Sequence, residues 1–457
     1  MIGEDPSAKS RYNFANDACR GRRHPVDAAG GTRHSPRSPA TAAANPNKRP
    51  RETMDDVSPS VLPDGELVPA DGPLPDSVRA ELGRRPFSLY VHVPYCATRC
   101  GYCDFNTYTA TELGDAPGAS RASYAAAAVA EIRHAREVVG PVDLPVQTVF
   151  VGGGTPTLLD PDDLGAVLTA VRDEFGLAPD AEVSTEANPD SVDEDSLARL
   201  RAHGFTRVSF GMQSARPHVL AILDRTHTPG RTEAAVAEAR KAGFDHVSLD
   251  LIYGTPGESE QDWRASLEAA TQAGPDHLSA YALIIEPGTR LAGRVRRGEL
   301  PAPDDDTVAD RYLLADQVLA AAGFGWYEVS NWATTSAARC RHNLAYWRSD
   351  DWWGIGPGAH SHVAGVRWWN VKHPAAYAEH LAAGRSPAHA REVLTAADRH
   401  VEEVMLGVRL VEGHPLTDLD PAGRAAAARL CEDGLLRPGD YANGRAALTL
   451  RLSLIHI

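Results

Sequence analysis

Short apolar runs rich in β-branched and aromatic residues alternate with helix-like stretches along the middle of the chain. The apolar runs predict β-strands at 88–93, 147–151, 182–187, 207–212, 247–253 and 277–284. Stretches rich in Ala, Leu and Arg predict helices between most of them, at 121–138, 161–175, 193–203, 231–242 and 259–273. This repetition of strand and helix favours a parallel sheet with right-handed crossovers. Six units are too few for a closed eight-stranded barrel, so the sequence predicts an α/β fold with an open, partial (β/α)6 TIM-like barrel.

The same pattern divides the chain into four segments. Residues 1–85 show no amphipathic period and are expected to be a disordered or mis-translated extension with a lead-in to the first strand. Residues 86–324 hold the predicted barrel, and residues 325–451, which are first rich in Trp and Gly and then helical, predict a smaller C-terminal α+β domain. Residues 452–457 are expected to be a non-native tail.

Both ends of the chain differ from the rest. Residues 1–53 carry ten Lys and Arg against five Asp and Glu, whereas the remaining residues have a net charge of −20. We expect Met54 to be the true initiator, and a functional basic arm is the alternative. The last six residues, Leu-Ser-Leu-Ile-His-Ile, can be back-translated to a sequencing adapter, and a short terminal strand is the alternative.

Composition and charge narrow the class of protein. The 457 residues are 43% hydrophobic and 23% charged, which suits a globular protein with a sizeable core. The net charge of −15 argues against nucleic-acid binding through overall charge. No apolar run reaches the roughly 20 residues that a membrane span needs, and the N-terminus has no signal-peptide pattern. Three of the six cysteines lie within eight residues, which favours a reducing compartment, so we expect the protein in the cytoplasm.

The three clustered cysteines come directly after the first predicted strand, in Cys96-Ala-Thr-Arg-Cys100-Gly-Tyr-Cys103. Thiolates are soft ligands that suit iron–sulfur clusters or zinc, and a closed structural zinc site needs a fourth ligand. Three thiolates on one short loop can bind three corners of a [4Fe–4S] cubane and leave one iron open. The spacing therefore predicts a cluster on Cys96, Cys100 and Cys103. A zinc knuckle completed by a distant His, or three unrelated thiols, are the alternatives.

Glycines and polar residues follow other predicted strands, at the edge where the active sites of such barrels gather. Gly152-Gly153-Gly154-Thr155-Pro156 follows the second strand, and glycines there let backbone N–H groups approach a ligand. Glu186 and Gln213 end the next two strands, and Asp250 lies within a very apolar strand. An acid in a buried strand is costly without a partner, so Asp250 indicates a functional contact. A tight turn and a surface charge are the alternatives for the glycine loop and for Glu186.

The residues from Tyr90 to Asn106 resemble the radical S-adenosylmethionine family around oxygen-independent coproporphyrinogen III dehydrogenase, also called oxidase. The resemblance extends from about Pro86 to Leu450. It implies that S-adenosylmethionine chelates the open iron and that the glycine loop binds its methionine amino group. The residues that the resemblance assigns to this cofactor are Tyr90, Tyr102, Gly153, Gly154, Thr155, Glu186, Gln213, Arg225 and Asp250.

Two features separate the branches of this family. The dehydrogenase carries a Cys two residues after the third cluster ligand, where this chain has Phe105. The segment His342-Asn-Leu-Ala-Tyr-Trp347 resembles the H-N-x-x-Y-W motif of the haem chaperone branch. Imidazole is a good ligand of haem iron, so the motif predicts His342 as a haem ligand, with a buried, hydrogen-bonded His as the alternative.

The resemblance therefore implies a haem chaperone that carries a [4Fe–4S] cluster, S-adenosylmethionine and haem. Such a protein would deliver haem to acceptor proteins, with respiratory proteins among the candidates, and would work as a monomer or dimer. The alternative is a coproporphyrinogen III dehydrogenase that converts two propionates to vinyl groups by oxidative decarboxylation. The sequence leaves open whether the protein is an enzyme.

Overall fold

A computed structural model describes residues 65–69, 72–225, 227–450 and 452. The predicted strands of the barrel are all present, as β2 (Phe87–Val93), β3 (Val146–Gly153), β4 (Leu177–Ala187), β5 (Arg207–Gln213), β6 (His246–Tyr253) and β7 (His277–Ala282). The predicted helices are α3 (Arg121–Val139), α4 (Pro161–Glu174), α5 (Glu194–His203), α7 (Arg231–Ala242) and α8 (Glu260–Gln272). Met54 with residues 1–53, and the last five residues of the expected tail, lie outside the described residues.

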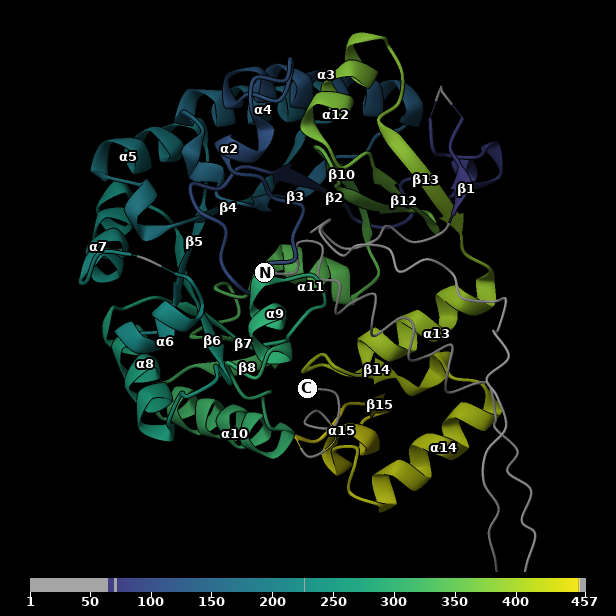
Figure 1. Ribbon diagram of the computed structural model, residues 1–457. Helices are drawn as coiled ribbons and strands as arrows, with labels where there is room; N and C mark the ends of the chain where they lie inside the picture. Colours follow the sequence, from purple (N-terminus) through teal and green to yellow (C-terminus); the bar gives the residue numbers. More distant parts are fainter. Residues whose placement is uncertain (1–64, 70–71, 226, 451, 453–457) are drawn as a thin grey trace, which may run out of the picture.

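Strands β2 to β7 lie side by side in chain order, and each pairs in parallel with the next. The partial α/β barrel that the sequence predicts is thus confirmed. Figure 1 shows α3, α4, α5, α7 and α8 along the outer side of the curved sheet, together with α10 (Asp305–Ala321). Shorter helices follow strand ends or connect strands: α2 (Ala110–Leu113), α6 (Pro217–Ile222) and α9 (Arg290–Arg296).

The sheet also continues past both ends of the predicted barrel. Within the described residues it has thirteen strands, in the order β1-β13-β12-β11-β10-β2-β3-β4-β5-β6-β7-β9-β8. The added strands are β1 (Glu66–Leu67), β8 (Gly325–Glu328), β9 (Asn331–Ala333), β10 (Asp351–Ile355), β11 (His360–Val363), β12 (Val366–Asn370) and β13 (Ala388–Val393). Strands from beyond residue 324 therefore share a sheet with the barrel. The domain boundary at residues 324–325 stays a prediction. Strands β8 to β13 follow that boundary in the chain but belong to the same sheet as the barrel strands.

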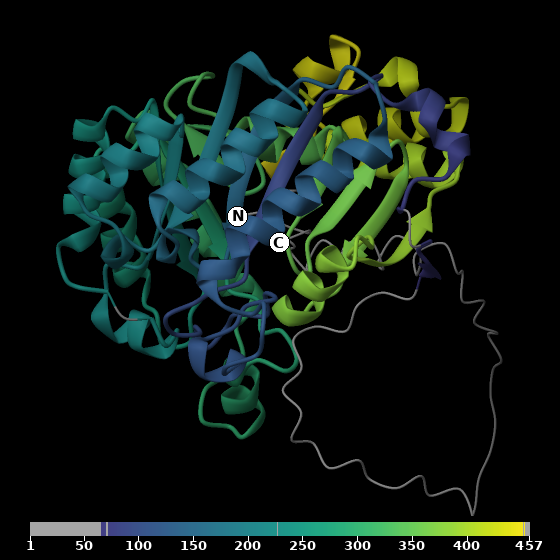
Figure 2. The same ribbon diagram turned by 90° about the horizontal axis from the view of Figure 1, so that it is seen from above.

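The remaining elements flank this sheet. Helix α11 (Arg341–Trp347) lies on its inner side and α12 (Pro374–Ala382) packs on α3 (Figure 1). The C-terminal elements gather in one corner, where they enclose a small core of their own. They are α13 (Ala396–Gly407), β14 (His414–Pro415), α14 (Pro421–Glu432), α15 (Pro438–Ala442) and β15 (Arg445–Ala446). Figure 2 shows that these helices lie on the side of the molecule away from α5 and α7.

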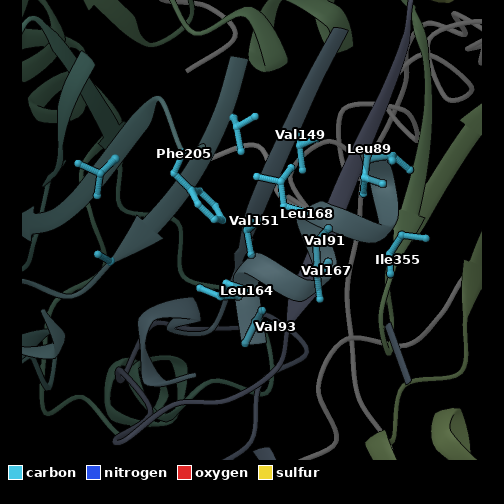
Figure 3. Packing of buried hydrophobic residues seen from close by; sticks show 14 of the residues in the cluster. Leu89, Val91, Val93, Val149, Val151, Leu164, Val167, Leu168, Phe205 and Ile355 are labelled. Atoms are coloured by element: carbon cyan, nitrogen blue, oxygen red, sulfur yellow. The ribbon is translucent and has the colours of Figure 1, made fainter. Parts of the chain in front are cut away.

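Alternation along the strands gives the sheet two different faces. Leu89, Val91 and Val93 of β2 point toward the outer helices, where Leu164 and Val167 of α4 belong to the same buried cluster (Figure 3). The alternate residues of β2, which include Tyr90, point to the inner face of the barrel. The inner face is where the predicted site residues meet.

No helix in the described part of the chain is both long and apolar enough to cross a membrane.

Candidate active site

The three predicted cluster cysteines lie on one loop between β2 and α2, and each is partly exposed. The loop is anchored by backbone hydrogen bonds: the N–H of Cys96 donates to Tyr108 at 3.0 Å and that of Gly101 to Leu223 at 3.0 Å. The N–H of Leu291, at the start of α9, donates to the Gly101 carbonyl at 2.7 Å. Three separate segments therefore fix the backbone that carries the thiols.

Burial raises the pKa of the Cys96 thiol to about 11 and that of the Cys103 thiol to about 12. Both thiols are thus protonated near neutral pH, and iron would displace the protons when it binds. Among the described residues, no three or more His, Cys, Asp or Glu side chains are arranged to hold a single metal ion. A cubane needs no such convergence, because it takes each thiolate at a different corner.

The glycine loop packs directly against the cysteine loop. The N–H groups of Gly154 and Thr155 donate to the carbonyls of Val93 and Tyr95, at 2.8 Å and 2.7 Å. A Cβ at Gly154 would collide with the Tyr95 carbonyl and would lie 3.0 Å from the sulfur of Cys96. Only glycine therefore lets this loop approach the first thiol so closely.

Glu186 and Asp250 are buried acids at the predicted edge of the sheet. The carboxylate of Glu186 accepts the N–H of Gly153 at 3.0 Å, which ties the end of β4 to the glycine loop. Burial, aided by the negative charge of Asp250, raises the pKa of Glu186 to about 7. Asp250 accepts hydrogen bonds from the hydroxyl of Ser209 at 3.1 Å and 3.0 Å. A cationic group bound near Glu186 would favour its ionised form.

Gln213 ends β5, and Arg225, which follows α6, reaches the cysteine loop. The guanidinium of Arg225 donates to the Gly211 carbonyl at 2.8 Å and to the Cys100 sulfur at 3.5 Å. The Nε of Arg225 and the Oε1 of Gln213 are buried and have no hydrogen-bond partner within the described residues. Such atoms are costly unless a ligand satisfies them, so these residues fit a bound polar cofactor.

The other residues assigned to the cofactor lie in two places. Tyr102 is next to Cys100 and Arg225, and Thr155 is hydrogen-bonded to Cys96. Tyr90 lies deeper in the barrel, where its hydroxyl is 3.1 Å from the Nδ1 of His92. The structure thus brings the predicted residues together around the cysteine and glycine loops, with Tyr90 on the inner side.

His342 lies inside the barrel and is only 1% exposed. Its ring stacks on Phe150, with 5.2 Å between the ring centroids. Its Nδ1 is 2.6 Å from the hydroxyl of Thr148 and its Nε2 is 2.9 Å from the hydroxyl of Tyr346. Burial lowers the pKa of His342 to about 3, so the imidazole is neutral. Both ring nitrogens have partners, so binding to haem iron requires one of them to exchange its partner.

Sequence reasoning missed the residues that hold the His342 segment in the barrel. Arg207 and Glu182 form a buried ion pair beneath it, and Thr148 binds His342 directly. The available signal was that these polar residues occupy inward positions of their strands. Without the position of α11, however, nothing in the sequence connects these residues with His342, which is more than one hundred residues away.

The chain matches the model of the Radical SAM superfamily over residues 90–270. It is 55% identical over 377 residues to a Mycobacterium tuberculosis protein named Heme chaperone HemW, which covers 82% of this chain and 94% of the relative. The chain belongs to the HemW family. The Escherichia coli protein of the same name is 35% identical, over 77% of this chain and 89% of the relative. The family that the sequence resembles is thereby confirmed.

A solved structure extends this relationship to the fold. Coproporphyrinogen III oxidase (HemN) from Escherichia coli superposes with a TM-score of 0.70 at 24% identity, over 83% of this chain and 90% of that structure. The likeness establishes the radical SAM fold of this HemW family member. Membership of the superfamily in turn implies a [4Fe–4S] cluster and S-adenosylmethionine, which the thiols and unsatisfied polar groups of the site fit.

Proposed function

We propose that this protein binds haem and delivers it to acceptor proteins, and that it carries a [4Fe–4S] cluster and S-adenosylmethionine. The observation that carries the proposal is the 55% identity to Heme chaperone HemW over 94% of that relative. The presence of Phe105 in place of the dehydrogenase cysteine, together with the His342 motif, supports the same branch.

In the proposed site, Cys96, Cys100 and Cys103 hold the cluster. The Gly153–Thr155 loop binds the methionine amino group of S-adenosylmethionine. Glu186 accepts hydrogen bonds from the ammonium or from the ribose diol of that cofactor. That site is completed by Tyr90, Tyr102, Gln213, Arg225 and Asp250. When bound, the cluster and cofactor supply one-electron chemistry. His342 supplies a neutral imidazole for haem iron, because burial keeps its pKa far below neutral pH.

We propose further that the protein works in the cytoplasm, where reduced thiols persist, as a monomer or dimer. Its acceptors would include respiratory haem proteins. Incubation of the haem-loaded protein with haem-depleted membranes tests this point. Haem should move to membrane proteins only when the loaded chaperone is present. Haem that stays on the chaperone under these conditions would argue against respiratory acceptors.

The central experiment compares two activities of one preparation. The protein is reconstituted anaerobically with iron and sulfide, and haem binding and coproporphyrinogen III consumption are then measured in parallel. We expect stoichiometric haem binding and no porphyrinogen turnover. Conversion of coproporphyrinogen III to protoporphyrinogen IX would instead support the dehydrogenase alternative.

Cysteine variants provide the matched controls. Cys100→Ser should abolish the absorption band of the cluster, whereas Cys431→Ser, in the distant helix α14, should leave it unchanged. A cluster that survives in Cys100→Ser would contradict the assigned ligands.

A further inference from the structure

Tyr346 and Thr148 hold His342 from opposite sides of its ring. Thr148 lies on β3 at the buried side, 2.6 Å from Nδ1. Tyr346 lies one turn later on α11, half-buried, with its hydroxyl 2.9 Å from Nε2. The ring of Tyr346 meets that of His342 edge-on at 4.8 Å and that of the half-buried Trp352 at 4.7 Å. The Nε2 edge is therefore the more accessible of the two.

The hydroxyl of Thr148 fixes which nitrogen carries the proton. It donates its own hydrogen to the hydroxyl of Ser88 at 2.9 Å. It must therefore accept the hydrogen bond at His342, which places the proton on Nδ1. The lone pair of the neutral ring is then on Nε2, where the hydroxyl of Tyr346 donates to it. A metal-bound His commonly has this arrangement. The ring nitrogen that does not bind the metal carries the proton, donates to a neighbouring oxygen and so orients the ring.

We propose that the hydroxyl of Tyr346 occupies the Nε2 lone pair of His342 until haem iron replaces this hydroxyl; this hydrogen bond is called the latch below. Thr148 fixes the tautomer of His342 that makes the exchange possible. The proposal rests on the proposed function, since it assumes that His342 is the haem ligand. In the exchange, the hydrogen bond from Tyr346 to Nε2 breaks and an iron–Nε2 bond forms. The phenol keeps its proton, and no electron is transferred. Thr148 is a positioning residue, because it bonds to His342 and not to the iron, and Ser88 acts on His342 only through Thr148.

The geometry also explains why the exchange can be local. Tyr346 and His342 belong to the same helix, while the buried Thr148 contact on β3 holds the imidazole in place. Rotation of the Tyr346 side chain exposes Nε2 without any change of the Nδ1 partner. The latch thus lowers the affinity of His342 for iron only by the free energy of one hydrogen bond.

Haem titration followed by the Soret band tests the latch. Tyr346→Phe should bind haem about fivefold more tightly, because one competing hydrogen bond is lost. Thr148→Val should bind haem more weakly by a similar factor, and Thr148→Ser should restore wild-type affinity. Tyr441→Phe, on the distant helix α15, is the matched control and should change nothing. Unchanged affinity in Tyr346→Phe would overturn the latch.

Nitrogen NMR of the haem-free protein provides a measurement that does not depend on haem. The His342 ring should show a protonated Nδ1 and an unprotonated Nε2, and a mixture of tautomers in Thr148→Val. A protonated Nε2 in the wild type would overturn the latch even if haem binds. Unchanged haem affinity in His342→Ala would overturn it as well, while the chaperone function would stand on another ligand. If the wild type binds no haem, the proposed function fails together with the latch.

Discussion

Arg207 on β5 and Glu182 on β4 form an ion pair inside the barrel, with 3.1 Å between Nε and Oε2 and side chains that are only 2% and 6% exposed. The pair also holds the segment that leads into α11. Arg207 donates to the carbonyls of Ala338 and Arg339, and Glu182 accepts the N–H of His342. Burial opposes ionisation of Glu182, but the charge of Arg207 holds the pKa of the carboxyl below its usual value. The pair thus anchors the His342 motif to the barrel wall.

This arrangement predicts the effect of removing one partner. Arg207→Met should destabilise the protein by about 3 to 5 kcal/mol, because the buried charge of Glu182 is left without its partner. The double variant Arg207→Met, Glu182→Leu should recover part of that loss, since no charge then remains buried. Urea denaturation followed by tryptophan fluorescence measures both. Arg297→Ala, in an exposed ion pair with Glu299, is the control and should leave the midpoint unchanged. A double variant less stable than the single one would contradict this account.

The barrel and the cluster loop could be predicted because their signals are local. An apolar run specifies its own strand, and the spacing of Cys96, Cys100 and Cys103 places three thiols on one loop. The parallel pairing of β10 with β2 could not be predicted in this way, since it joins residues more than 250 positions apart and leaves no local pattern. Burial of His342 was one of the two sequence alternatives, but its partner on β3 could not be predicted. Its motif indicates chemistry, whereas its hydrogen bonds depend on the strand positions that surround α11.

The close approach of the glycine and cysteine loops leads to a second prediction. Gly154→Ala should prevent cluster assembly or greatly reduce it, because the added methyl group collides with the Tyr95 carbonyl beside Cys96. Gly439→Ala is a matched control, since a Cβ there meets no atom within 4 Å. Iron content and the cluster absorption band after anaerobic reconstitution provide the measurement. Normal cluster content in Gly154→Ala would mean that the two loops need not touch.

The unsatisfied groups around the cofactor site give a third prediction. Gln213→Ala should weaken binding of S-adenosylmethionine about tenfold, because the cofactor would lose a hydrogen bond in a buried site. The cluster should form as in the wild type, since Gln213 is not one of its ligands. Gln147→Ala is the control, because the Gln147 amide donates to the nearby carbonyl of Pro145 at an exposed position. Isothermal titration of the cluster-loaded protein decides the point. Equal affinity in the two variants would exclude Gln213 from the site.

Glu131 of α3 is a fully buried carboxyl that lies outside the proposed site. It accepts the N–H of Gly356 and the side-chain amide of Asn370, both at 2.7 Å, as well as the hydroxyl of Tyr377. It thus links α3 to the residue that follows β10, to β12 and to α12. Burial raises the pKa of Glu131 from 4.5 to about 7, although the three hydrogen bonds oppose this shift. The folded protein therefore holds the Glu131 proton more tightly than the unfolded chain does.

The sign of the pH effect follows from this shift. A carboxyl with a raised pKa contributes its full stability below pH 4.5 and loses it as the pH rises through about 7. Between about pH 5 and about pH 8, the wild type should lose on the order of 2 kcal/mol more stability than Glu131→Gln, which cannot ionise. Glu131→Gln should also be less stable at low pH, because an amide nitrogen, which cannot accept, replaces one of the oxygens that accept these hydrogen bonds. Urea midpoints measured for both proteins across this range provide the test. Parallel pH profiles would show that Glu131 does not titrate in this range.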